Sequence, residues 1–90
     1  MSDIGEEVVT ITAVVVHTIR MAYVEDPDLF VAEPIYKWQQ TDAGKWIMKN
    51  SNPIPMWKRT YDTKTYFGYA YYIHAYLKPK EYTYWKLKYE

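Results

Sequence analysis

The chain has 90 residues, of which 49% are hydrophobic, 19% aromatic and 24% charged, and its formal net charge at pH 7 is zero. This length allows one domain, residues 1–90, and excludes separate catalytic and regulatory domains. Disorder requires low hydrophobicity and a high net charge, so the composition indicates a folded chain. The chain contains no cysteine, which excludes zinc sites built from thiolates and any cysteine nucleophile.

The absence of cysteine also indicates where the protein works. Small secreted domains usually rely on disulfides, so an intracellular protein is favoured. No apolar run approaches the ~20 residues of a membrane span, and the acidic N-terminus lacks the basic region of a signal peptide. We therefore expect a cytoplasmic protein that has no membrane partner.

Charge is distributed unevenly along the chain. Residues 1–44 hold eight acidic and two basic side chains, giving −6, whereas residues 45–90 hold nine basic and three acidic ones, giving +6. The two halves either lie side by side and neutralise each other, or form an acidic and a basic face. The first interpretation is the simpler one.

A long strand is predicted over residues 7–24, after a tail over residues 1–6. Valine, isoleucine and threonine dominate this segment, and they favour a pleated strand. The odd positions are mostly apolar, which places them, His17 included, on the core face. Eighteen residues exceed the usual strand length, so we expect a bend, a bulge or pairing with a partner's sheet.

One main helix is predicted over residues 27–50. Asp26 precedes Pro27; aspartate caps free backbone amides, and proline is favoured at the first helical position. Pro34 lies inside the pattern, so we expect a kink near that residue. Gly44 is expected to weaken the helix by about 1 kcal/mol relative to alanine.

Three further strands are predicted over residues 56–61, 65–77 and 81–89. Polar turns, one of them containing Pro79, separate runs in which aromatic residues alternate with other residues. The predicted element order is therefore β-α-β-β-β. The simplest α+β fold with this order is a curved four-stranded antiparallel sheet with the main helix packed on one face.

A surface rich in tyrosine is the best functional hint in the sequence. If segments 65–77 and 81–89 are strands, alternation gathers their even-numbered aromatic residues on one side, flanked by lysines. Such a surface is too aromatic for ordinary solvent exposure, which indicates a contact site. Its predicted contact residues are Tyr66, Tyr72, His74, Tyr76, Tyr82 and Tyr84.

The residues that usually carry chemistry are few and scattered. His17 is expected in the core and His74 at the surface or an interface, and neither has a second ligand at metal-binding spacing in the sequence. The acidic residues of segment 25–33 lack the glycine and the spacing of a calcium loop, so helix capping explains them better. We therefore predict no metal, no cofactor, no catalytic residue and no enzymatic activity.

Two functions compete for the tyrosine-rich surface. Tyrosine and tryptophan are enriched in interface cores, which favours a self-associating binding or assembly module, most simply a twofold dimer. The alternative is a single-stranded nucleic-acid binder, in which tyrosines stack on bases and lysines contact phosphates. The first function is favoured because the chain has only two arginines and a net charge of zero, whereas nucleic-acid-binding domains usually carry an excess of positive charge.

The segment DPDLFVAEPIYKWQQTDAGKW, residues 26–46, resembles short uncharacterised proteins of T4-like phages of marine cyanobacteria. The tyrosine-rich segment that follows resembles them more loosely. The resemblance implies a small phage accessory or virion-associated protein in the host-cell cytoplasm, with a host or phage protein as its partner. It implies no activity and transfers no functional residue.

Overall fold

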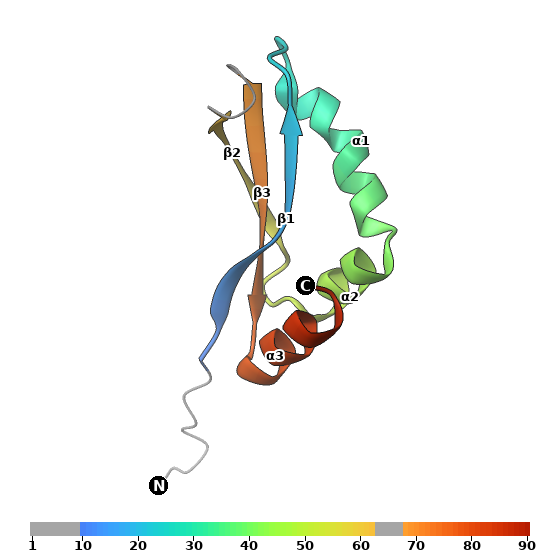
Figure 1. The fold of residues 1–90 in the computed structure, drawn as a ribbon, viewed down its shortest axis with the longest axis vertical. Coiled ribbons are helices and arrows are strands. Elements are labelled where there is room, and N and C mark those ends of the chain that lie inside the picture. Colours follow the sequence, from blue (N-terminus) through green and yellow to red (C-terminus); the bar gives the residue numbers. More distant parts are fainter. Residues whose placement is uncertain (1–9, 63–67) are drawn as a thin grey trace, which may run out of the picture.

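The structure, a computed structural model, describes residues 10–62 and 68–90. These ranges form a small α+β fold with an open antiparallel sheet, which confirms the predicted class (Figure 1). The elements in chain order are β1 (Thr12–Met21), α1 (Pro27–Gln39), α2 (Asp42–Asn50), β2 (Met56–Asp62), β3 (Gly68–Leu77) and α3 (Pro79–Lys88).

The sheet has three strands in the described ranges, in the order β1-β3-β2, and every pairing is antiparallel. β3 is the central strand, and its side chains Tyr71, Ile73, Ala75 and Leu77 are at most 2% exposed. Alternation places these four on the same face. β1 and β2 flank β3, so both are edge strands.

β1 contains a bulge that changes which of its residues face the core. Its register against β3 shifts between Val15 and His17, so that Val16 is an extra residue. From His17 onward the odd positions share a face with the buried residues of β3, as predicted. Before the bulge the prediction is wrong, because Val14 lies opposite buried Ala75 while Val15 is 44% exposed.

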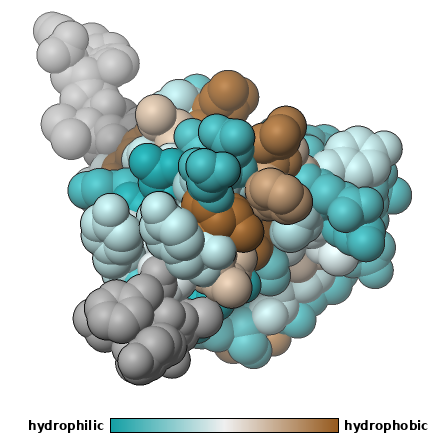
Figure 2. All heavy atoms as spheres, turned by 90° about the horizontal axis from the view of Figure 1, so that it is seen from above, coloured by the Kyte–Doolittle hydropathy of each residue, from teal (hydrophilic) through white to brown (hydrophobic). Residues whose placement is uncertain are grey.

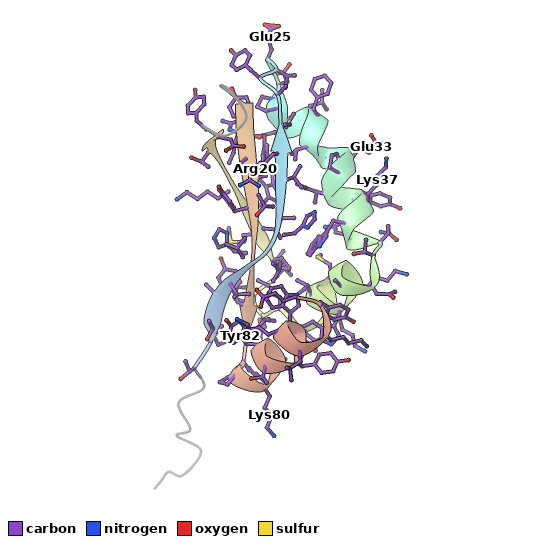
Figure 3. The ribbon with its side chains drawn as sticks, viewed as in Figure 1. Arg20, Glu25, Glu33, Lys37, Lys80 and Tyr82 are labelled. Carbon is purple, nitrogen blue, oxygen red and sulfur yellow. The ribbon has the colours of Figure 1, made fainter. Side chains whose placement is uncertain are left out.

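All three helices contribute to the hydrophobic core on one face of the sheet. The larger cluster joins residues of α1, α2, β3 and α3: Trp38, Ile47, Ile73, Ala75, Leu77 and Trp85. A smaller cluster at the other end joins Val31 of α1 to Tyr69 and Tyr71 of β3. Glu33 and Lys37 form an ion pair of 3.9 Å on the outer side of α1 (Figure 3).

The single helix predicted over residues 27–50 is two helices. α1 runs through Pro34 and ends at Gln39, so the break lies after the helix rather than at the proline. Thr41 has extended backbone angles, and its hydroxyl accepts a hydrogen bond of 3.0 Å from the amide of Gly44. Threonine is a good N-cap, so a second helix begins here.

The strand predicted over residues 81–89 is wrong, because this segment forms helix α3. Pro79 occupies the first turn, and a carboxylate oxygen of Glu81 accepts a hydrogen bond of 2.8 Å from the backbone amide of Lys78. These are helix-start features that the sequence interpretation assigned to a turn. Trp85 anchors the helix in the core.

The predicted four-stranded sheet therefore becomes a three-stranded one. The strand predicted over 56–61 is confirmed as β2, and the strand predicted over 65–77 is confirmed from Gly68 onward. The predicted tail and the first residues of two predicted strands lie outside the described residues, namely 1–6 for the tail and 7–9 and 65–67 for the strands. Within the described ranges, β1 pairs with β3 and not with β2, so β2 is left as an edge strand.

Candidate functional site

The predicted tyrosine-rich surface does not form one site. Tyr72, His74 and Tyr76 alternate along β3 on the sheet face opposite the helices. Tyr82 and Tyr84 lie on α3, in the helical layer. Tyr66 lies outside the described residues. The structure thus groups three of the six predicted contact residues.

The sheet face opposite the helices, called the open face here, carries a shallow hollow of about 390 Å³. Its lining residues come from all three strands and are Val15, Lys58, Thr60, Tyr72 and His74. Tyr72, His74 and Tyr76 are half-buried, so their rings lie partly against their neighbours on the sheet. Near one end, Nε of Arg20 and Oδ2 of Asp62 form an ion pair of 3.0 Å, with the Asp62 side chain 5% exposed.

The two tyrosines of α3 hold that helix in place. Tyr82 is half-buried against the larger core cluster and lies where α3 meets the strands (Figure 3). Tyr84 stacks on Trp46 of α2 with ring centroids 5.2 Å apart, and its hydroxyl accepts a hydrogen bond of 3.1 Å from Lys88. These contacts give both residues a structural role.

A second surface, which the sequence interpretation missed, lies on the helix-facing side of β2. Alternation places Trp57, Arg59 and Tyr61 on this side, and we call these three residues the aromatic edge. Trp57 is 43% exposed and Tyr61 is 73% exposed. The alternation of residues 56–61 was visible in the sequence, but the fourth strand then expected obscured the position of β2 at the sheet edge.

The aromatic edge is fixed by ring contacts to β3. The rings of Trp57 and Tyr71 lie 5.3 Å apart, and those of Tyr61 and Tyr69 lie 5.4 Å apart. The guanidinium of Arg59 lies 5.4 Å from the centre of the Tyr69 ring, within the range of a cation–π contact. These contacts hold the three side chains in place, while the rings of Trp57 and Tyr61 stay exposed.

Asp28 of α1 connects the aromatic edge to the helical layer. Its Oδ1 accepts hydrogen bonds from the Tyr71 hydroxyl at 2.6 Å and from Arg59 at 3.1 Å. Burial and the bond to Asp28 raise the pKa of Tyr71 to about 12. The capping role expected for the acidic segment is wrong for Asp26, which occupies the N-cap position of α1 without a side-chain capping bond.

His17 lies half-buried between the sheet and α1, on the side of β1 that faces the helices. Its ring stacks on Trp38 of α1 with centroids 5.5 Å apart and an angle of 14° between the planes. Burial lowers the pKa of His17, because the charged imidazolium loses hydration. Within residues 10–62 and 68–90, no three histidine, aspartate or glutamate side chains gather closely enough to hold a metal ion.

Hydrophobic side chains are also exposed at the end of the molecule where α1 begins (Figure 2). They include Leu29, 73% exposed, and Phe30, 59% exposed. Isolated exposed apolar side chains are common, so they do not define a site. Among the helices of the described residues, none is long and apolar enough to cross a membrane.

Comparison with protein-family models, with curated proteins and with solved structures finds no match for this chain. The resemblance of residues 26–46 to phage proteins therefore stays a prediction.

Proposed function

We propose that this protein is a small non-enzymatic assembly module that associates with further copies of itself through its sheet. The observation that carries the proposal is the aromatic edge. Trp57 and Tyr61 lie on an edge strand, and both are held by ring contacts to β3 but substantially exposed. Tryptophan and tyrosine with fixed rings are the residues that most often supply binding energy in protein interfaces.

The position of β2 supports the same proposal. An edge strand presents unpaired backbone N–H and C=O groups, which can pair with another strand. In the part of the chain that the structure describes, no strand lies beyond β2. An exposed edge with adjacent aromatic rings therefore offers both hydrogen bonds and apolar area to a partner.

Absolute mass in solution, measured by light scattering on a sizing column, tests the proposal. We expect a species of at least two chains that persists at high salt, because aromatic burial and backbone hydrogen bonds are little screened. The variant Tyr61→Glu should lower the mass, since it places a carboxylate among aromatic rings. Its matched control is Tyr36→Glu on α1, where the tyrosine is 61% exposed, and this variant should keep the wild-type mass.

A wild-type monomer at all concentrations would contradict self-association. Binding of single-stranded nucleic acid through the open face would then be the leading proposal, because Lys58, Tyr72 and His74 surround one hollow. A lysine beside rings on a sheet matches the combination used to bind single strands. The corresponding test is a titration with a mixed-sequence oligonucleotide, in which affinity must fall as salt rises.

A further inference from the structure

We propose that two copies pair antiparallel through β2, about a twofold axis at Arg59, to form one continuous six-stranded sheet. This inference rests on the proposed function, and it names the partner as a second copy and fixes the geometry. It follows from a comparison of the two sheet edges, from the order of residues along β2 and from the contacts of Arg59.

The two edges of the sheet are not equivalent. β1 carries the bulge at Val16, and bulges disturb the spacing of backbone groups that a new strand would need. β2 pairs with β3 in unbroken register from Met56 to Asp62 and shows no bulge. Every residue of β2 before Asp62 is exposed. β2 is therefore the edge that can accept a partner strand along its whole length.

The residues of β2 are self-complementary about Arg59. The strand has seven residues, and Arg59 is the middle one, so pairing centred there uses the full strand. Trp57 of each copy then lies opposite Tyr61 of the other on the helix-facing side. Directly opposite aromatic pairs are among the pairs that stabilise antiparallel strands. On the open face Lys58 lies opposite Thr60, so no lysine faces another lysine.

Neighbouring registers lose these advantages. An axis at Lys58 sets two lysines opposite each other, and like charges in directly opposite positions are destabilising. An axis at Thr60 pairs only residues 58–62 within β2. It also leaves Trp57 without a partner residue in that strand. Among registers that keep the helices of both copies on the same side, the one centred on Arg59 is thus the most favourable.

Arg59 itself does not obstruct the edge. A charged side chain in the middle of an edge strand usually protects it against pairing. Here the guanidinium is directed back over β3, where it lies over Tyr69 and forms an ion pair of 3.1 Å with Asp28. The positive charge is therefore compensated within each copy, which reduces the repulsion between the two arginines at the axis.

Pairing in this way would also double the open face. The helices of both copies would lie on one side of the six-stranded sheet, and both hollows lined by Lys58, Tyr72 and His74 on the other. The aromatic edges would meet in the middle of the helix-facing side. The assembly would thus cover β2 and leave the open face available.

Disulfide trapping tests the register. No native thiol can interfere, because the chain has no cysteine. Single cysteines are introduced as Lys58→Cys, Arg59→Cys and Thr60→Cys, and each variant is oxidised gently. Opposite residues in antiparallel strands lie about 4.5–5.5 Å apart between Cα atoms, within the range of a disulfide. The Cα atom of a residue one position from the axis lies about 8 Å from the Cα atom of the same residue in the other copy, which is too far for a disulfide.

We expect a covalent dimer with Arg59→Cys at several-fold higher yield than with either neighbour. A higher yield at Lys58→Cys or Thr60→Cys would overturn the register. Because Arg59→Cys removes the pair with Asp28, a second measurement oxidises an equimolar mixture of Lys58→Cys and Thr60→Cys. Their cysteines lie opposite each other in this register, and both variants keep Trp57, Arg59 and Tyr61. Failure of both to trap a dimer, while wild type remains a dimer by light scattering, would overturn the edge pairing but not the proposed function.

The variant Tyr72→Lys separates the edge from the open face. It adds charge to the open face and leaves β2 unchanged, so the dimer should persist. A monomeric Tyr72→Lys together with a dimeric Tyr61→Glu would assign self-association to the open face and overturn the edge pairing. A wild-type monomer would overturn both the edge pairing and the proposed function.

Discussion

Tyr71 lies in the central strand with no exposed surface, and its hydroxyl donates a hydrogen bond to Asp28 of α1. Tyr71→Phe removes this bond to a charged acceptor and should lower the free energy of unfolding by about 1–2 kcal/mol, measured by urea denaturation. The control is Tyr61→Phe, whose ring is 73% exposed, and it should change stability by less than about 0.5 kcal/mol. Equal effects of the two variants would contradict the role of the bond.

The raised pKa of Tyr71 predicts that the stability of the protein depends on pH in the alkaline range. Folding raises the pKa of Tyr71 to about 12, whereas an unfolded tyrosine ionises near 10. Between these values the unfolded chain releases a proton that the folded chain keeps, so the stabilising contribution falls as pH rises from 10 to 12. The stability difference between wild type and Tyr71→Phe should therefore narrow over this range.

At the scale of secondary-structure elements, Gly44 allows α2 to lie close to the end of α1. A Cβ atom at this position would overlap the backbone carbonyl oxygen of Trp38. Helix propensity alone predicts that Gly44→Ala stabilises the protein by about 1 kcal/mol. The close contact predicts the opposite, a loss of about 1–3 kcal/mol.

Thermal or urea denaturation of Gly44→Ala decides between these two effects. Lys45→Ala, at an exposed position of the same helix, measures the response of α2 to alanine without the close contact. A Gly44→Ala protein about 1 kcal/mol more stable than wild type would show that α1 and α2 can separate without cost.

The elements also show how far sequence reasoning reaches. The α+β class, β2 and most of β3 followed from alternation and turn residues. α3 did not, because the spacing of Tyr82, Trp85 and Tyr89 suits a helical stripe while the odd residues of the same segment suit a strand. Pro79 and Glu81 are helix-start residues in the sequence, and the packing agrees with them. The three rings meet the larger core cluster, whereas Leu87 stays 83% exposed.

The candidate site was predicted less well than the fold for the same reason. A contact surface on a sheet depends on which strands are neighbours and which is last, and that order depends on tertiary packing. The strand predicted over residues 81–89 places Tyr82 and Tyr84 with Tyr72 on one face. Their position on α3 removes them from that face. Tyr61 is exposed because β1 lies on the other side of β3 and does not cover β2.

At the scale of the whole molecule, the two oppositely charged halves of the chain interleave. Asp28 from the acidic half pairs with Arg59 from the basic half, at 3.1 Å. Arg20 and Asp62 form the converse pair at 3.0 Å. The halves therefore contact each other at both pairs, but only the Asp28–Arg59 pair neutralises part of the excess charge of each half. The aromatic edge therefore lies beside compensated charge, which suits an interface that is insensitive to salt.

His17 gives the whole fold a dependence on acid, because it lies between the sheet and α1. Burial lowers its pKa below the ordinary value of about 6.5, so the unfolded chain takes up a proton before the folded chain does as pH falls. The stabilising contribution of neutral His17 is present above pH 6.5 and is lost as pH falls toward the lowered pKa. Wild type should therefore become less stable between pH 7.5 and pH 5.5.

Two variants of His17 separate its charge from its ring. His17→Phe keeps a ring to stack on Trp38, and His17→Gln does not, but neither can take up a proton. Urea denaturation at several pH values should show a weaker dependence on pH than wild type for both. Only His17→Gln should also lose stability at pH 7.5. If His17→Phe kept the full wild-type decline in acid, another group would have to carry it, and the half-buried imidazole between the layers would be purely structural.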